Sequence, residues 1–211
     1  MKEDLSKAFA RELLSLGAVL LRPSEPFTWA SGWHSPIYTD NRQVLSSPSL
    51  RSMVAEALAE KVSTLYPEVQ VIAGVATGAI AVGVLAADRL SEPFVYVRSK
   101  PKDHGTGSQI EGKLPKGAKV VVIEDLVSTG KSSLEAVRAL RSAGADVLGM
   151  IALFTYDFPQ AVDAFTQEGV ELTTLSSYPV LIGEALGAGY IKEEDMPLLS
   201  EWRKSPSTWG Q

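Results

Sequence analysis

Two adjacent acidic side chains precede a run of hydroxyls in the segment 120–133, VVVIEDLVSTGKSS. The end of this run, Gly130, Lys131 and Ser132, matches the end of an ATP-binding P-loop. That motif also needs a glycine five residues before its second glycine, and Asp125 occupies this position. The P-loop interpretation therefore fails on spacing, and the two acids need another chemical role.

The residues around the acids have the composition of a phosphate site. A buried strand expected over 119–124 delivers the following loop to the carboxyl edge of a sheet, where open α/β proteins bind ligands. A helix expected after this loop adds free N–H groups and its positive dipole end, and Ser128 and Thr129 add hydroxyl donors. Because carboxylates repel phosphate, Glu124 and Asp125 are expected to bind sugar hydroxyls, a metal or positive charge developing on carbon. Together these groups predict a ribose 5-phosphate site, and the alternative is that the acids cap a helix or lie on the surface.

A second segment rich in cations and glycine, SKPKDHGTGSQIEGKLPKGA, occupies 99–118. Irregular stretches of this length inside compact domains are usually lids or binding loops. We therefore expect a mobile cationic lid that gathers Arg98, Lys100, Lys102 and His104 over an anion. The alternative is a solvated hairpin with an ordinary charged surface.

The elements that position these segments alternate along the chain. The expected helices cover 4–16, 49–65, 80–90 and 131–143, and the expected strands cover 69–75, 94–98, 119–124 and 147–156. Residues 18–44 indicate short strands or loops placed before the main sheet. Apolar strands that alternate with helices are typical of a parallel sheet covered on both faces. The sequence thus predicts a doubly wound α/β fold, with a mostly parallel sheet flanked by helices, in a single domain over 1–211.

Composition narrows the classes of function. The 211 residues are 45% hydrophobic, carry a formal net charge of -5 and include no cysteine. The acidic balance argues against general attraction to nucleic acid or to anionic membranes. The absence of cysteine excludes disulfides, thiolate metal sites and a cysteine nucleophile, and fits a reducing compartment. Since no apolar run approaches 18 residues, we expect a soluble, cytoplasmic protein.

These motifs carry a family resemblance. VVVIEDLVSTGKSS resembles the phosphoribosyl pyrophosphate signature of type I phosphoribosyltransferases. RSKPKDHGTG resembles the cationic loop of the orotate phosphoribosyltransferase family, and FTWASGWHSPIYTDNR (27–42) and WRKSPSTW resemble other segments of the same family. The resemblance covers nearly the whole chain, and it implies the type I phosphoribosyltransferase fold with a small N-terminal hood over the sheet.

The resemblance implies the transfer of ribose 5-phosphate from phosphoribosyl pyrophosphate to orotate, which forms orotidine 5'-phosphate and pyrophosphate in pyrimidine biosynthesis. The catalytic residues would be Lys102, Glu124 and Asp125, and the two acids would hold the ribose hydroxyls and favour positive charge on C1. The residues implied in phosphoribosyl pyrophosphate binding are Arg98, Lys100, Lys102, His104, Glu124, Asp125, Leu126, Val127, Ser128, Thr129, Gly130, Lys131 and Ser132. Orotate would lie against Ile37 and Tyr38, with Ser128 as a hydrogen-bonding group.

The resemblance also implies a cofactor and a partner. Mg²⁺ would arrive on the pyrophosphate, and no side chain is assigned as its ligand. The partner would be a second copy of the chain, in a homodimer whose subunits exchange the cationic loop. Two other functions are weighed: a purine phosphoribosyltransferase, and a regulator that senses phosphoribosyl pyrophosphate without catalysis.

The sequence departs from the family pattern at several cationic positions. Ser99 follows the loop arginine, and the lysine comes one residue later at Lys100. Ala30 and Gly78 stand where the family often has lysine, and ALFTYDFP lacks a frequent family arginine. Recognition of the orotate carboxylate is therefore the least determined part of the site.

Overall fold

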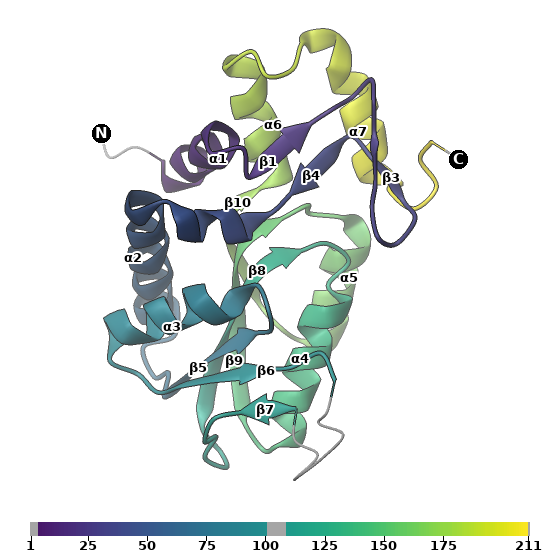
Figure 1. The fold of residues 1–211 in the computed structure, drawn as a ribbon. Coiled ribbons are helices and arrows are strands. Elements are labelled where there is room, and N and C mark those ends of the chain that lie inside the picture. Colours follow the sequence, from purple (N-terminus) through teal and green to yellow (C-terminus); the bar gives the residue numbers. More distant parts are fainter. Residues whose placement is uncertain (1–3, 101–108, 211) are drawn as a thin grey trace.

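A six-stranded sheet forms the centre of the molecule, in the strand order β10-β9-β8-β5-β6-β7 (Figure 1). The computed structural model describes residues 4–100 and 109–210. The strands are β5 (Val71–Val75), β6 (Phe94–Val97), β7 (Ile110–Glu111), β8 (Lys119–Val127), β9 (Asp146–Thr155) and β10 (Leu172–Ser177). All neighbouring pairs are parallel except β6 and β7, which are antiparallel. The predicted mostly parallel sheet is confirmed.

Helices cover both faces of this sheet (Figure 1). The flanking helices are α2 (Pro48–Leu65), α3 (Ala79–Leu90), α4 (Lys131–Ser142) and α5 (Pro159–Glu168). In β8, Val121 and Ile123 pack into the core on the α2 and α3 side, whereas Val120 and Val122 pack with α4 and α5. Because each strand is buried on both faces, β8 reads as a continuous apolar run.

Both ends of the chain build the hood above the sheet (Figure 1). Its elements are α1 (Leu5–Ser15), β1 (Val19–Leu21), β2 (Phe27–Thr28), β3 (His34–Ser35), β4 (Ile37–Thr39), the 3-10 helix η1 (Asn41–Ser46), α6 (Tyr178–Gly187), the 3-10 helix η2 (Glu193–Asp195) and α7 (Met196–Lys204). Short antiparallel pairs join β1 to β4 and β2 to β3. The fully buried Trp202 of α7 packs against Trp29, Tyr156 and Phe158, so the C-terminal helices anchor the N-terminal strands.

The observed elements lie within a few residues of the predicted ones, with one consequential difference. The strand predicted over 119–124 continues to Val127, because β8 stays paired with β9 as far as the pair of Val127 with Thr155. Backbone pairing does not require apolar side chains, so the polar residues did not end the strand. Asp125 therefore lies inside β8 with Glu124, and not in the loop after the strand. No helix in the described part of the chain has the length and apolar character needed to cross a membrane.

Candidate functional site

The two acids of β8 point to opposite sides of the sheet, as neighbours in a strand do. Glu124 lies on the α4 side, where Ser133 donates a hydrogen bond of 2.8 Å to its Oε2. The backbone N–H of Asp125 donates to Oε1 of Glu124 at 3.0 Å. Burial raises the pKa of Glu124 well above its ordinary value, and the negative charge of Asp125 raises it further. Glu124 is thus held inside the protein, whereas Asp125 is partly exposed.

Asp125 is fixed from two other segments. The side-chain amide of Asn41, at the start of η1, donates a hydrogen bond of 2.6 Å to the carbonyl oxygen of Asp125. The Asp125 carboxylate occupies the space beside Gly78, where an added Cβ would overlap with Oδ2. Gly78 immediately precedes α3, so the beginning of that helix directly faces the acid. Only a residue without a side chain fits this approach.

The loop between Asp125 and α4 has the geometry of an anion site. Gly130 adopts φ +79° at the beginning of α4, and a Cβ there would lie 2.8 Å from the Phe165 ring. Ser128 and Thr129 are partly exposed just before it. The first N–H groups of α4 have no partner within the helix, so they can donate hydrogen bonds to an anion. Among the other predicted loop residues, Leu126 is partly exposed, Val127 is buried, and Lys131 and Ser132 are exposed.

A pocket of about 240 Å³ opens between the hood and this loop. It is lined by Thr28, Trp29, Ala30, Tyr38, Thr39, Leu126, Ser128 and Tyr156. The Trp29 and Tyr156 rings lie 5.1 Å apart at an angle of 37°. Three aromatic side chains line the pocket, so it suits the flat face of a planar ring.

The structure brings two of the three predicted orotate residues to this pocket. Tyr38 and Ser128 line it. The side chain of Ile37 is instead fully buried in the core, and its carbonyl oxygen accepts a hydrogen bond of 3.1 Å from Trp29 Nε1. This difference follows from strand alternation, because Ile37 and Tyr38 face opposite sides of β4. Burial also raises the pKa of Tyr156, and the nearby Thr39 hydroxyl opposes that rise.

Two arginines come from segments that carry the family resemblance, although the sequence gave neither arginine a role. Arg42 donates from Nε to Asp40 at 2.7 Å, and this bonding lowers the pKa of Asp40. The positive charge of Arg42 also interacts with Tyr38 and Asp125. Arg203 of α7 pairs with the Asp157 carboxylate at 2.6 Å, just after β9. Arg42 therefore supplies positive charge near Tyr38 and Asp125, although Ala30 and Gly78 carry none.

Only the base of the predicted cationic lid lies within the residues that the structure describes. Arg98 donates its backbone N–H to the Gln109 carbonyl at 2.9 Å, and its guanidinium lies 3.8 Å from the Glu111 carboxylate. Lys100 is exposed at the end of this base. Lys102 and His104 lie outside the described residues, so their predicted roles stay predictions.

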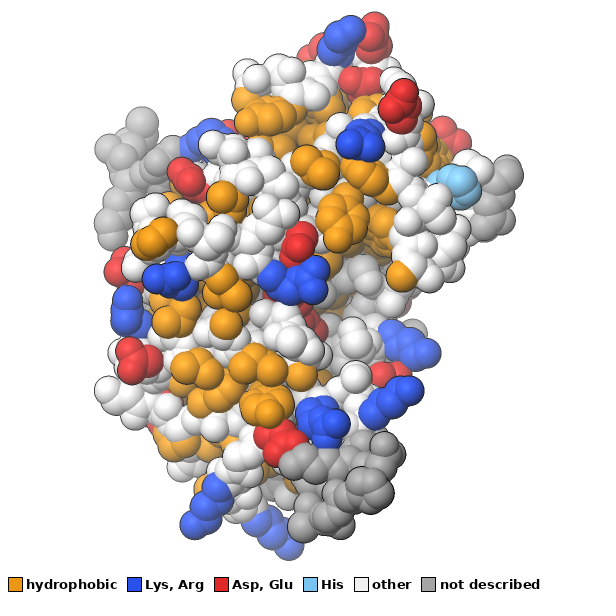
Figure 2. Space-filling model, in the orientation of Figure 1, with side chains coloured by type: hydrophobic (Ala, Val, Ile, Leu, Met, Phe, Trp, Pro, Cys, Tyr) orange, Lys and Arg blue, Asp and Glu red, His pale blue; other side chains and the backbone are white. Residues whose placement is uncertain are grey.

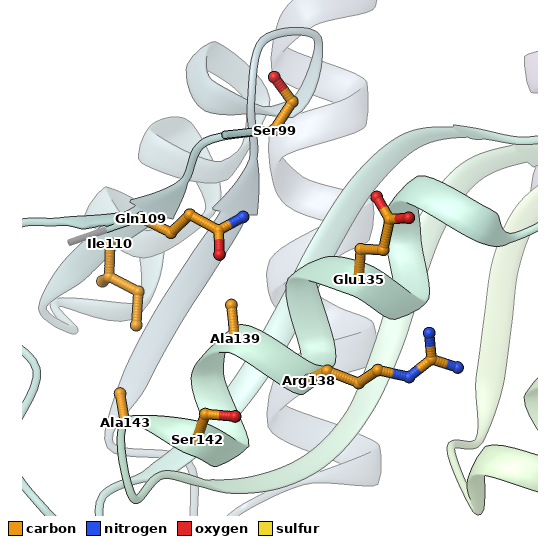
Figure 3. A pocket seen from close by; sticks show the side chains of 8 residues that line it. All are labelled: Ser99, Gln109, Ile110, Glu135, Arg138, Ala139, Ser142 and Ala143. Carbon is orange, nitrogen blue, oxygen red and sulfur yellow. The ribbon is translucent and has the colours of Figure 1, made fainter. Parts of the chain in front are cut away.

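A wider hollow of about 580 Å³ runs between this base and the outer surface of α4 (Figure 3). Ser99 and Gln109 border it on one side, and Glu135 and Arg138 on the other. Neither the acids of β8 nor any hood residue lines it. The aromatic pocket, which shares Ser128 with the anion loop, is therefore the better candidate for a substrate site.

The sequence of this chain is similar to those of known proteins. Residues 40–164 match the family described as "Phosphoribosyl transferase domain". The chain is 55% identical to the orotate phosphoribosyltransferase of Phocaeicola vulgatus over 207 residues, which cover 98% of both chains. It is 52% identical to the enzyme of that name from Lactococcus lactis subsp. cremoris, over 98% of this chain and 99% of the relative. The chain belongs to the orotate phosphoribosyltransferase family.

Solved structures of this family share the fold. The orotate phosphoribosyltransferase from Aeropyrum pernix superposes with a TM-score of 0.75 at 33% identity, over 87% of this chain and 99% of that one. Leishmania donovani UMP synthase superposes with a TM-score of 0.79 at 28% identity over 94% of this chain. The present chain spans 42% of that longer protein.

Sequence reasoning missed four positions that the fold brings to the site. Thr39, Asn41 and Tyr156 come from the hood and from the end of β9, and Gly78 comes from the loop before α3. Thr39 and Asn41 lie in the segment 27–42 that carries part of the family resemblance, and Gly78 was noted only as a missing lysine, but no residue type or spacing marked any of the four as a site residue. One clue was available. Ile37, Thr39 and Asn41 stand at alternate positions, and the first is apolar whereas the other two are polar.

Proposed function

We propose that this chain transfers ribose 5-phosphate from phosphoribosyl pyrophosphate to orotate and releases pyrophosphate and orotidine 5'-phosphate. The observation that carries the proposal is that the anion loop and the aromatic pocket share two residues. Leu126 and Ser128 belong to the anion loop and also line the aromatic pocket, so a phosphosugar on the loop and a base in the pocket would be neighbours. The full-length identity to enzymes named orotate phosphoribosyltransferase supports the same reaction.

The chemistry follows from the positions of the charges. The bond between C1 of the ribose and the pyrophosphate oxygen breaks, and its electron pair leaves with pyrophosphate. A ring nitrogen of orotate forms the new bond to C1 with its own electron pair and loses its proton. Asp125, fixed by Asn41 and by the space at Gly78, supplies negative charge near the carbon that becomes positive. The N-terminus of α4 would hold the 5-phosphate.

Mg²⁺ is part of this proposal. Among the described residues, no three side chains of His, Asp, Glu or Cys gather into a metal site. Mg²⁺ in phosphoryl sites usually takes one or two carboxylates and completes its shell with substrate oxygens and water. Asp125, the partly exposed acid, fits that sparse donor set. When bound, the ion would neutralise charge on the departing pyrophosphate.

Loss of orotate absorbance in the presence of phosphoribosyl pyrophosphate and Mg²⁺ tests the proposal directly. We expect turnover with orotate, none in excess chelator, and none with adenine, guanine or xanthine. Turnover of a purine instead would establish the purine phosphoribosyltransferase alternative. Binding of phosphoribosyl pyrophosphate without turnover of any base would establish the sensor alternative.

The proposal includes a homodimer in which subunits exchange their cationic loops. Figure 2 shows hydrophobic side chains over the α3 region, and Val84 of α3 is 45% exposed. Such surface suits a second copy of the chain. Lys102→Ala and Asp125→Ala proteins, each expected to be nearly inactive, should regain roughly a quarter of wild-type activity when unfolded and refolded together, because half of a random mixture is heterodimer with one intact site. Heterodimers without activity would place each loop over its own subunit's site.

A cytoplasmic location is also proposed. It is supported by the absence of cysteine, which fits a reducing compartment.

A further inference from the structure

The buried acid of β8 connects the two sides of the anion loop. Glu124 is only 3% exposed, and both of its carboxyl oxygens accept a hydrogen bond. Oε1 accepts at 3.0 Å from the backbone N–H of Asp125, in the same strand. Oε2 accepts at 2.8 Å from the hydroxyl of Ser133, in the first turn of α4. One side chain thus joins the strand before the loop to the helix after it.

The beginning of α4 lacks the side-chain cap that often fixes the start of a helix. Its N-cap residue is Gly130, which has no side chain to accept a hydrogen bond from the first N–H groups. Ser133 is 1% exposed, so its bond to Glu124 ties the start of the helix to β8 inside the protein. The N–H groups of the first turn remain available to an anion.

An anion site made of backbone N–H groups requires a loop that is held in one geometry. Productive binding sites are kept within about 0.5 Å by hydrogen bonds from residues that support the ligand-binding groups. Because Glu124 and Asp125 face opposite sides of β8, Glu124 can hold the loop from the α4 side while Asp125 acts on the substrate side. Loss of the Ser133 hydroxyl would leave a buried carboxyl oxygen without its partner and release the start of α4.

We propose that Ser133 is a positioning residue for the transfer reaction: through the Glu124 carboxyl it holds the beginning of α4 against β8, and so fixes the anion loop that receives the 5-phosphate. This inference rests on the proposed function and deepens it. The Ser133 hydroxyl is directed at Glu124 inside the protein, so the residue acts through that carboxyl and not by contact with the ligand. It lies one position beyond Ser132, the last residue that the sequence implied in substrate binding.

Ser133→Ala tests the proposal, because it removes the hydroxyl and keeps a residue that suits a helix. We expect kcat/KM for phosphoribosyl pyrophosphate to fall by about tenfold, with the KM for orotate within about twofold of wild type. The Kd of ribose 5-phosphate, measured by calorimetry, should rise by a similar factor, because the loop holds its phosphate. Ser176→Ala is the matched control. Ser176 is also 1% exposed and accepts a hydrogen bond from Ser6, but it lies in β10, so all three values should stay unchanged.

A double-mutant cycle shows whether Ser133 acts through Glu124. In a Glu124→Ala background, Ser133→Ala should lower kcat/KM for phosphoribosyl pyrophosphate by less than about twofold, because the partner of the hydroxyl is already gone. A second tenfold loss in that background would overturn the proposal. So would an unchanged kcat/KM in folded Ser133→Ala protein, or an equal rise in the KM of both substrates, which would indicate general loosening of the fold.

Two further measurements keep the outcomes separate. Ser133→Cys has a side chain of similar size and a weaker donor, and it replaces Ser133→Ala in every comparison if the alanine protein does not fold. Wild-type protein that binds ribose 5-phosphate but has no activity on orotate would overturn the proposed function. The Kd of ribose 5-phosphate in the Ser133 variants would then still decide whether this residue positions the loop.

Discussion

The anion loop and the aromatic pocket differ in how they are built. The anion loop and the two acids before it, residues 124–132, come from one continuous stretch at the end of β8 and the beginning of α4. The pocket takes its walls from 28–30, from β4, from the loop itself and from Tyr156. Charge and helix dipoles dominate the first region, and aromatic packing dominates the second. Changes in the loop are therefore expected to act on turnover, and changes in the pocket on the KM for the base.

Asp125→Asn should have the largest effect. The substitution removes the negative charge near C1 and keeps the shape, so kcat should fall by at least about tenfold, equivalent to about 1.4 kcal/mol of transition-state stabilisation. The KM for orotate should change little. Steady-state kinetics measures both, and Asp146→Asn, an exposed acid at the start of β9, is the matched control. An unchanged kcat in Asp125→Asn would show that the acid has no catalytic role.

Gly78→Ala should reproduce part of this loss without touching an acid. The new methyl group would occupy the position of the Asp125 carboxylate, so kcat should fall by about tenfold. The double variant Gly78→Ala/Asp125→Asn should be hardly worse than Asp125→Asn alone, because both changes act on one group. Gly183→Ala, in α6 with open space around it, should be fully active. Additive losses in the double variant would show that Gly78 acts elsewhere.

Asn41 lies between the two regions, so its replacement should change both kcat and the KM for orotate. Asn41→Ala removes the donor to the Asp125 carbonyl, so we expect kcat to fall and the KM for orotate to rise, each by about threefold. Asn41→Asp keeps the shape but cannot donate, and should be at least as impaired. Kinetics of both variants with varied orotate measures the two parameters separately. A change in only one parameter would confine Asn41 to one region.

Glu124 should affect stability, with a characteristic dependence on pH. Its pKa in the folded protein is raised above the ordinary value of 4.5, so the folded state holds its proton more tightly than the unfolded state. This group therefore makes the protein less stable as pH rises above about 4.5 towards its raised pKa. The free energy of unfolding of Glu124→Gln relative to wild type should increase over that window, by about 1.4 kcal/mol for each unit of the pKa shift.

Denaturant unfolding at several pH values measures this difference. Glu168→Gln is a control of opposite sign, because hydrogen bonding to Arg138 lowers the pKa of Glu168. That carboxylate stabilises the protein above about pH 4.5, and its contribution is lost as pH falls through the lowered pKa. A relative stability of Glu124→Gln that is independent of pH would contradict the raised pKa.

The predictions of helices and strands were correct where the local sequence pattern and the tertiary packing agree. The apolar strands and the helices between them were predictable, because a strand buried on both faces needs apolar residues at every position. The anion loop was predictable because its hydroxyls, its glycine and the start of α4 are neighbours in the chain. The extension of β8 from Asp125 to Val127 was not predictable, since pairing with β9 depends on the backbone alone.

The sequence by itself determined the apolar strands, the acids and the chemistry of the loop, because these depend on residues within about one turn or strand of each other. Only the tertiary structure decided that Glu124 is buried against Ser133 while Asp125 remains partly exposed. It also decided that Gly78 makes room for Asp125, and that Thr39 meets Tyr156 in one pocket. These arrangements depend on which side of a strand a residue faces and on which distant segment packs there, and neither is encoded in a local pattern.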